Sequence, residues 1–143
     1  MPALVQVVFM SQAWAEACLP RPDEAVVSIT DRGAPDADLN DGWAAVLRVA
    51  FDDVDPVETP MAPGEGLVEI QAHEAERIAA FVHALRHRVG TLVVHCRYGQ
   101  SRSAGVAKAV AEAYGLHFPA NYRYANNFVH DAVLQALRRQ DGA

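Results

Sequence analysis

The chain has 143 residues, 51% of them hydrophobic and 21% charged, which suits one globular domain over residues 1–143 with a sizeable buried core. Its formal net charge of −6 excludes a protein that coats nucleic acid, because no basic block is present to replace counterions on a phosphate backbone. Its two cysteines, Cys18 and Cys96, are too few for a disulfide framework or a cysteine-rich zinc site.

The first half of the chain alternates apolar runs with turn residues, a pattern typical of strands. The predicted strands cover residues 6–10, 25–30 and 45–51. A short helix over residues 12–18 is expected between the first two strands, and a helical turn over residues 41–45 is expected before the third. Leu47, Val49 and Phe51 alternate along the third strand, which indicates one buried face.

The middle of the chain contains a segment whose prolines and glycines exclude regular structure. This segment, residues 56–66, directly follows a cluster of aspartates and is predicted to be a surface loop. Such a loop is either a mobile lid that closes over a site or a simple connector. The sequence leaves both interpretations open.

Helices dominate the second half of the chain. The first is predicted over residues 71–88 and ends before Gly90. Its apolar positions at helical spacing are Ala75, Ile78, Val82 and Leu85. A short apolar strand over residues 91–95 leads to a helix over residues 103–114 that Gly115 closes. The inward-facing residues of a last helix, over residues 127–139, are expected to be Phe128, Ala132, Val133 and Leu137.

Strands that alternate with helices predict an α/β fold. We expect a single domain with a central, mostly parallel sheet of about four to five strands, flanked by helices on both faces. In such sheets, ligands bind at the carboxyl ends of the strands. The residues that follow the strands 45–51 and 91–95 are therefore candidates for a functional site.

The most informative stretch is His-Cys-Arg-Tyr-Gly-Gln-Ser-Arg-Ser, residues 95–103, which joins the last strand to a helix. A thiolate at Cys96 is stabilised by the macrodipole and free N–H groups of a helix N-terminus. Five residues separate Cys96 from Arg102, enough for the loop amides to converge on an anion while the guanidinium returns as a bidentate clamp. Gly99 permits a positive φ or a close approach of the backbone, and Ser103 brings a hydroxyl near the sulfur.

The pattern His-Cys, five residues, Arg-Ser resembles the phosphate-binding loop of the protein tyrosine phosphatase superfamily. The chain is most similar to the small dual-specificity-type phosphatases, especially short bacterial versions, and a weaker likeness spans most of its length. This resemblance implies a phosphotyrosine protein phosphatase-like α/β fold. It also implies hydrolysis of phosphate monoesters through a phosphocysteine intermediate, without a metal or another cofactor.

The resemblance implies a role for each residue of the loop. Cys96 is the nucleophile, Arg102 binds phosphoryl oxygens, and Ser103 stabilises the thiolate when the phosphocysteine bond breaks. His95 supports the base of the loop, and Tyr98 is expected to contact substrate at the rim. The positions that bind substrate, mainly through backbone amides, are Arg97, Tyr98, Gly99, Gln100, Ser101 and Arg102.

A general acid is expected to protonate the leaving oxygen, since an alkoxide or phenoxide is a poor leaving group. Matching the apolar residues of the strand 45–51 to the family pattern places this acid at Asp53, with Asp52 and Asp55 as alternatives. The stretch between Asp53 and Cys96 is longer than in compact family members, so the choice among the three carboxylates stays open. A polar turn of solvated aspartates is the structural alternative.

The leading functional prediction is a phosphatase for protein phosphotyrosine, with phosphoserine, phosphothreonine or a small phosphate monoester as further substrates. A rhodanese-like sulfurtransferase, an arsenate reductase and an inactive phosphate-binding module are the alternatives. A working thiolate needs a reducing compartment, and the first residues lack the pattern of a secretory signal, so we expect a cytoplasmic protein. No membrane partner is expected, since no apolar stretch approaches the length of a span.

Three further polar residues have two interpretations each. Asn126 and Asn127 precede the last helix, where the sequence favours an N-cap over a substrate contact. Cys18 is interpreted as structural, with a protective disulfide to Cys96 on oxidation as the alternative.

Overall fold

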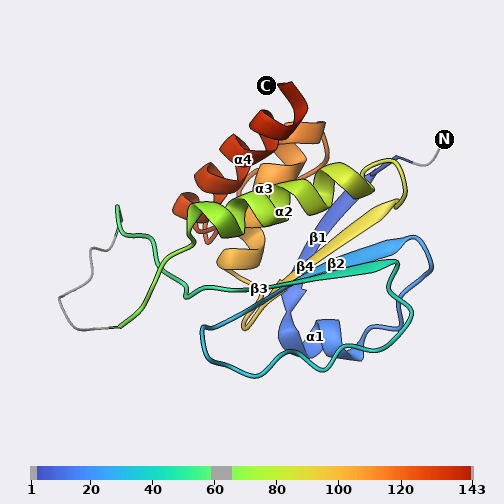
Figure 1. Cartoon of the computed structure of the whole chain (residues 1–143), viewed down its shortest axis with the longest axis horizontal. Coiled ribbons are helices and arrows are strands. Elements are labelled where there is room, and N and C mark those ends of the chain that lie inside the picture. Colours follow the sequence, from blue (N-terminus) through green and yellow to red (C-terminus); the bar gives the residue numbers. More distant parts are fainter. Residues whose placement is uncertain (1–2, 59–65, 143) are drawn as a thin grey trace.

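The computed structural model describes residues 3–58 and 66–142. Within them, four strands form a parallel sheet in the order β1-β4-β2-β3 (Figure 1). The strands are β1 Gln6–Ser11, β2 Glu24–Thr30, β3 Ala45–Ala50 and β4 Thr91–Cys96. Each agrees with a predicted strand to within one residue at either end. The prediction of one small α/β domain around a parallel sheet is confirmed.

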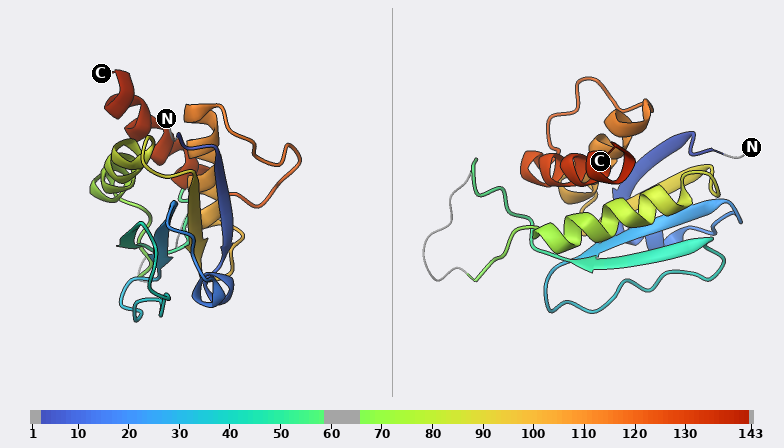
Figure 2. Two further views of the ribbon diagram at one scale, coloured as in Figure 1. Left: turned by 90° about the vertical axis from the view of Figure 1, so that its right-hand side faces the viewer. Right: turned by 45° about the horizontal axis from the view of Figure 1, so that its top comes forward.

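The helices occupy both sides of this sheet. They are α1 Gln12–Ala17, α2 Ala72–Leu85, α3 Arg102–Tyr114 and α4 Asn127–Gly142. α2, α3 and α4 lie together on one side, where α4 packs against both of the others, and α1 lies on the other side with the segment 34–44 (Figure 1 and Figure 2). No helix of residues 3–58 and 66–142 has the length and apolar composition needed to cross a membrane.

The main hydrophobic core lies between the sheet and the helices α2, α3 and α4. The central strand β2 directs Ala25, Val27 and Ile29 into this core. The alternate residues of β2, such as Val26 and Ser28, are buried on the opposite face. A central parallel strand is buried on both faces, which explains the nearly continuous apolar sequence of β2.

Three sequence predictions need correction. The helical turn expected over residues 41–45 does not form, because Gly42 has a φ of 108° and the Ala44 N–H already bonds to Glu24 O at 2.8 Å as part of the sheet. α2 ends at Leu85, and residues 86–88 form a turn instead of a further helical turn. α4 continues beyond residue 139 to Gly142, where Asp141 Oδ1 lies 2.6 Å from His83 Nδ1 of α2.

The interpretation of the loop 56–66 as a lid falls mostly on residues 59–65, which lie outside the described residues. Pro56, Val57 and Glu58 form a turn.

The parallel sheet brings the carboxyl ends of its four strands to one edge. β1 and β4 are paired through their last residues, Ser11 and Cys96. The segments that leave this edge are residues 31–33 after β2, residues 51–55 after β3 and residues 97–101 after β4. The fold therefore places the aspartate cluster and the cysteine loop at the same end of the sheet.

Candidate active site

Residues 97–101 form a loop from the carboxyl end of β4 to the first turn of α3, the setting that the sequence predicts. Within it, Gly99 has a φ of 72°, a left-handed conformation that glycine adopts without steric cost. A Cβ at this position would lie 2.8 Å from Met10 O and closer still to Ser11 N, which are backbone atoms at the end of β1. The loop rests directly on the neighbouring strand, and glycine is required here for two separate reasons.

Cys96 lies at the junction of this strand and loop, and it is only 2% exposed. Its Sγ is 3.1 Å from Ser103 Oγ and accepts the Ser103 N–H at 3.4 Å. Ser103 belongs to the first turn of α3, where the helix macrodipole carries its partial positive charge. The sulfur therefore lies against the first turn of a helix, where free backbone N–H groups can interact with a thiolate.

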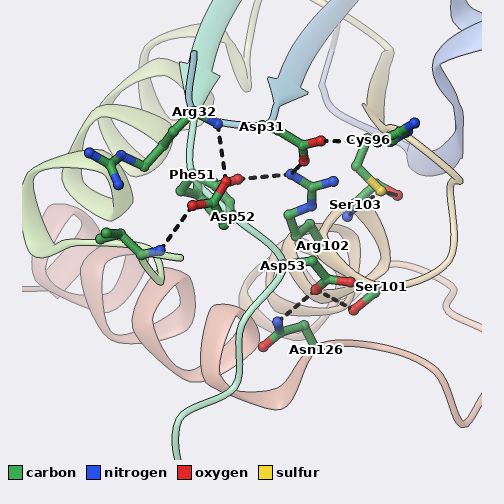
Figure 3. Close-up of polar contacts among 12 residues, drawn as sticks. Asp31, Arg32, Phe51, Asp52, Asp53, Cys96, Ser101, Arg102, Ser103 and Asn126 are labelled. Atoms are coloured by element: carbon green, nitrogen blue, oxygen red, sulfur yellow. Dashed lines mark hydrogen bonds and ion pairs between the residues drawn. The ribbon is translucent and has the colours of Figure 1, made fainter. Parts of the chain in front are cut away.

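Arg102 begins α3 and returns its guanidinium to the same edge of the sheet, where it is 3% exposed. Its Nη1 donates to Phe51 O at 2.8 Å and forms an ion pair with Asp31 Oδ1, also at 2.8 Å (Figure 3). Its Nε is buried and has no hydrogen-bond partner among the described residues. One part of the guanidinium is thus fixed by the protein, and another donor remains free for an anion.

Asp31 is a member of this site that sequence reasoning did not identify. It directly follows β2, and its carboxylate also lies 3.5 Å from Arg97 Nη1. Only the strand order could have placed Asp31 beside the cysteine loop, because β2 and β4 are neighbours in the sheet and their ends are adjacent. Without the strand order, Asp31 looks like an ordinary turn residue.

The side chains of Arg97 and Tyr98, the first two residues of the loop, lie at the surface. Arg97 is 5.2 Å from the ring centroid of Tyr98, a cation–π contact at the surface, and Tyr98 itself is 70% exposed. The Gln100 carbonyl accepts a 2.6 Å hydrogen bond from the hydroxyl of Tyr122. This arrangement is compatible with a loop that acts through its backbone N–H groups.

Two of the three candidate acids accept hydrogen bonds from backbone N–H groups. Asp52 is buried, and its two oxygens accept the N–H groups of Arg32 at 3.2 Å and Val68 at 2.9 Å. Asp55 Oδ1 accepts the N–H groups of Val57 and Glu58, both at 3.1 Å. These contacts give Asp52 and Asp55 structural tasks, although Asp55 also lines the cavity that Asp53 and Ser101 border.

Asp53 is the candidate acid that contacts the loop. Its Oδ1 accepts hydrogen bonds from Ser101 Oγ at 2.7 Å and from Asn126 Nδ2 at 3.1 Å (Figure 3). Ser101 immediately precedes Arg102, so the carboxylate lies against the same loop that holds the guanidinium. The structure brings Asp53 into one site with Ser101, Arg102 and Cys96.

His95 lies beneath the loop and is fully buried. Its Nε2 is 2.6 Å from Ser28 Oγ on the neighbouring strand β2. Burial is the main cause that lowers the pKa of His95 below its ordinary value, so the imidazole is neutral near pH 7. These contacts link β4 to β2 and support the base of the loop.

Asn126 is the N-cap of α4, as the sequence favours. Its Oδ1 accepts the Val129 N–H at 3.0 Å, and its carbonyl accepts the His130 N–H at 3.0 Å. Asn127 is the first residue of the helix and is exposed. Sequence reasoning did not identify the contact of Asn126 with Asp53, because residues 53 and 126 are far apart along the chain.

Two cavities adjoin the loop. A cavity of about 490 Å³ lies on the side of the candidate acid, and its lining includes Asp53, Ser101, Asn126 and Arg123. A second, of about 620 Å³, lies on the other side and is lined in part by Trp14, Tyr98 and Tyr122. Tyr124 contributes to both. The loop is therefore accessible from two directions.

Both cysteines are free, and Cys18 Sγ lies 3.8 Å from Met10 Sδ. Over residues 3–58 and 66–142, no group of three or more His, Cys, Asp or Glu side chains is arranged to hold a metal ion.

No protein-family model matches this sequence, and a search of curated proteins finds no significant match.

Proposed function

We propose that this protein is a cysteine-dependent phosphatase that hydrolyses phosphate monoesters through a phosphocysteine intermediate. The observation that carries the proposal is the pairing of two groups on one strand–loop–helix unit. The Cys96 sulfur contacts the first turn of α3, and the Arg102 guanidinium has a buried Nε without a partner among the described residues. The resemblance of residues 95–103 to the loop of protein tyrosine phosphatases points to the same chemistry.

In the first chemical step, the Cys96 thiolate attacks phosphorus, and the bond between phosphorus and the ester oxygen breaks. Arg102 Nε and the N–H groups of residues 97–102 bind the phosphoryl oxygens, where negative charge is greatest in the transition state. Asp53, in its acid form, gives its proton to the leaving oxygen. The products of this step are the free alcohol or phenol and a phosphocysteine.

In the second step, a water molecule attacks the phosphocysteine. The Asp53 carboxylate takes the proton from this water, the bond between sulfur and phosphorus breaks, and inorganic phosphate leaves. Ser103, whose hydroxyl oxygen is 3.1 Å from the sulfur, donates a hydrogen bond to the departing thiolate. Each group returns to its starting protonation state, and no atom changes its oxidation state in either step.

Protein phosphotyrosine is the substrate class that we propose first. Because Cys96 is only 2% exposed, a phosphoryl group must reach inward from the protein surface. The long side chain of phosphotyrosine reaches further than that of phosphoserine or phosphothreonine, which we propose as secondary substrates. We assign the activity to the cytoplasm, where thiols are kept reduced.

The test is hydrolysis of para-nitrophenyl phosphate by the wild-type protein and by Cys96→Ser, in the presence of EDTA and with or without vanadate. We expect turnover that resists EDTA, is inhibited by vanadate and is lost in Cys96→Ser, whereas the matched variant Cys18→Ser keeps it. Turnover of thiosulfate or arsenate without phosphatase activity would instead favour a sulfurtransferase or an arsenate reductase. Binding of phosphate without any turnover would favour the inactive module.

A further inference from the structure

We propose that Asn126 is a positioning residue that holds Asp53 in the orientation needed for proton transfer. This inference rests on the proposed phosphatase function and extends it to the N-cap residue of α4. Asn126 is 6% exposed, and its side-chain amide donates to Asp53 Oδ1 at 3.1 Å and to Val54 O at 3.0 Å. The contact reaches the candidate acid from a helix that is 73 residues away along the chain.

Asn126 can orient its neighbour because its own position is fixed at every polar atom. Its backbone N–H donates to Ser101 O at 3.0 Å, and its side-chain Oδ1 caps α4 through the Val129 N–H. The α3 helix approaches it closely, since a Cβ at Gly105 would lie 2.6 Å from Asn126 O. The direction of the Nδ2 donor is therefore set by the packing of α3 against α4.

Asp53, in contrast, has little else to hold it. It is exposed and follows the end of β3 in a segment without regular structure. An exposed carboxylate samples several rotamers, and the loss of this freedom must be offset by specific contacts. Its side-chain contacts are the hydrogen bonds from Ser101 and Asn126. These two donors restrict Asp53 to one orientation beside the loop.

The geometry also distinguishes the two oxygens of Asp53. Ser101 Oγ and Asn126 Nδ2 both donate to Oδ1, which is therefore the oxygen that accepts hydrogen bonds in the acid form (Figure 3). Oδ2 has no hydrogen-bond partner among the described residues, which leaves it available to carry the proton. We infer that Oδ2 delivers the proton to the leaving oxygen, and that Asn126 acts on the reaction only through Asp53.

The experiment separates this role from helix capping. In Asn126→Ser the hydroxyl still caps α4 but is too short to donate to Asp53, and Asn126→Asp keeps the cap and the size but replaces the donor with an acceptor. Both variants are compared with Asn127→Ser, at the exposed neighbouring position. The readout is the dependence of kcat on the pKa of the leaving phenol across a series of aryl phosphates.

We expect Asn126→Ser and Asn126→Asp to lose about tenfold or more in kcat with poor leaving groups and little with good ones, because misplacement of a catalytic group by about 1 Å costs up to a hundredfold. Asn127→Ser should behave as the wild type does. In a double-mutant cycle, Asn126→Ser should add almost nothing to the loss caused by Asp53→Asn.

An equal loss for all leaving groups, or full additivity with Asp53→Asn, would overturn the positioning role. The positioning role would also be overturned if Asp53→Asn shows the expected dependence on the leaving group while both Asn126 variants have wild-type kinetics. That last result would leave the proposed phosphatase function standing. If the wild-type protein itself hydrolyses no aryl phosphate, the proposed function fails and this inference fails with it.

Discussion

Replacing Gly99 with alanine adds one methyl group at the point where the cysteine loop rests on the end of β1. The new Cβ would lie 2.8 Å from Met10 O and closer still to Ser11 N. These are backbone atoms of a strand that is paired along its length with β4, so they cannot move aside as a flexible side chain can. The variant must strain the loop, displace it from β1, or both.

The cost has two parts. A non-glycine residue in the left-handed region costs about 1–2 kcal/mol, which applies because the φ of Gly99 is 72°. Overpacking against fixed atoms typically costs about 1–3 kcal/mol more. Gly33 provides a matched control, because its φ is 78° but a Cβ there would meet no atom within 4 Å. Gly33→Ala should therefore show the first cost alone.

The assay combines urea unfolding with hydrolysis of para-nitrophenyl phosphate. We expect Gly99→Ala to lower the free energy of unfolding by about 2–5 kcal/mol, or to relieve the clash by moving the loop and lose at least about tenfold in activity. Gly33→Ala should lose about 1–2 kcal/mol and keep its activity. A Gly99→Ala variant with both the stability and the activity of the wild type would refute the account of how the loop is built.

Three further predictions concern the ionisable groups of the site. Arg102→Lys should lower kcat/KM by about a hundredfold or more, because a single ammonium cannot contact Phe51 O and Asp31 and also bind two phosphoryl oxygens. Unchanged kinetics would contradict this role of Arg102. Asp53→Asn should slow the hydrolysis of esters with poor leaving groups by about a hundredfold, and those with good leaving groups far less; a uniform loss would remove Asp53 as the acid. Burial lowers the pKa of His95 below 6.5, so the unfolded chain binds a proton there that the folded chain does not. The contribution of neutral His95 to the free energy of unfolding is therefore complete above about pH 6.5 and is lost as the pH falls. In urea unfolding, the free energy of unfolding of His95→Gln should decrease less on acidification than that of the wild type.

The sequence was most informative where local pattern decides the structure. The four strands could be predicted because short apolar runs are bounded by turn residues, and α3 because Gly115 takes the left-handed C-cap conformation. The helical turn over residues 41–45 was wrong because local composition does not reveal that Gly42 adopts a positive φ. Nor does it reveal that Ala44 already pairs with β2.

The candidate site was predictable only in part, for a similar reason. The loop residues are contiguous, so their spacing and the family resemblance were enough to predict roles for Cys96 and Arg102, which stay predictions. Asp53, Asp52 and Asp55 could not be ranked by spacing, because the direction of each side chain depends on which backbone groups it bonds. Contacts of Asp31 with Arg102 and of Asn126 with Asp53 depend on strand order and helix packing.

The capture of a phosphocysteine tests the central claim most directly. Wild-type protein that is turning over an aryl phosphate is quenched in acid, digested, and examined by mass spectrometry for the peptide that contains Cys96. We expect this peptide to gain the mass of one phosphoryl group, and we expect neither the Cys96→Ser protein nor the peptide containing Cys18 to show the gain. Steady turnover with no phosphorylated Cys96, or with the phosphoryl group on another residue, would contradict the account.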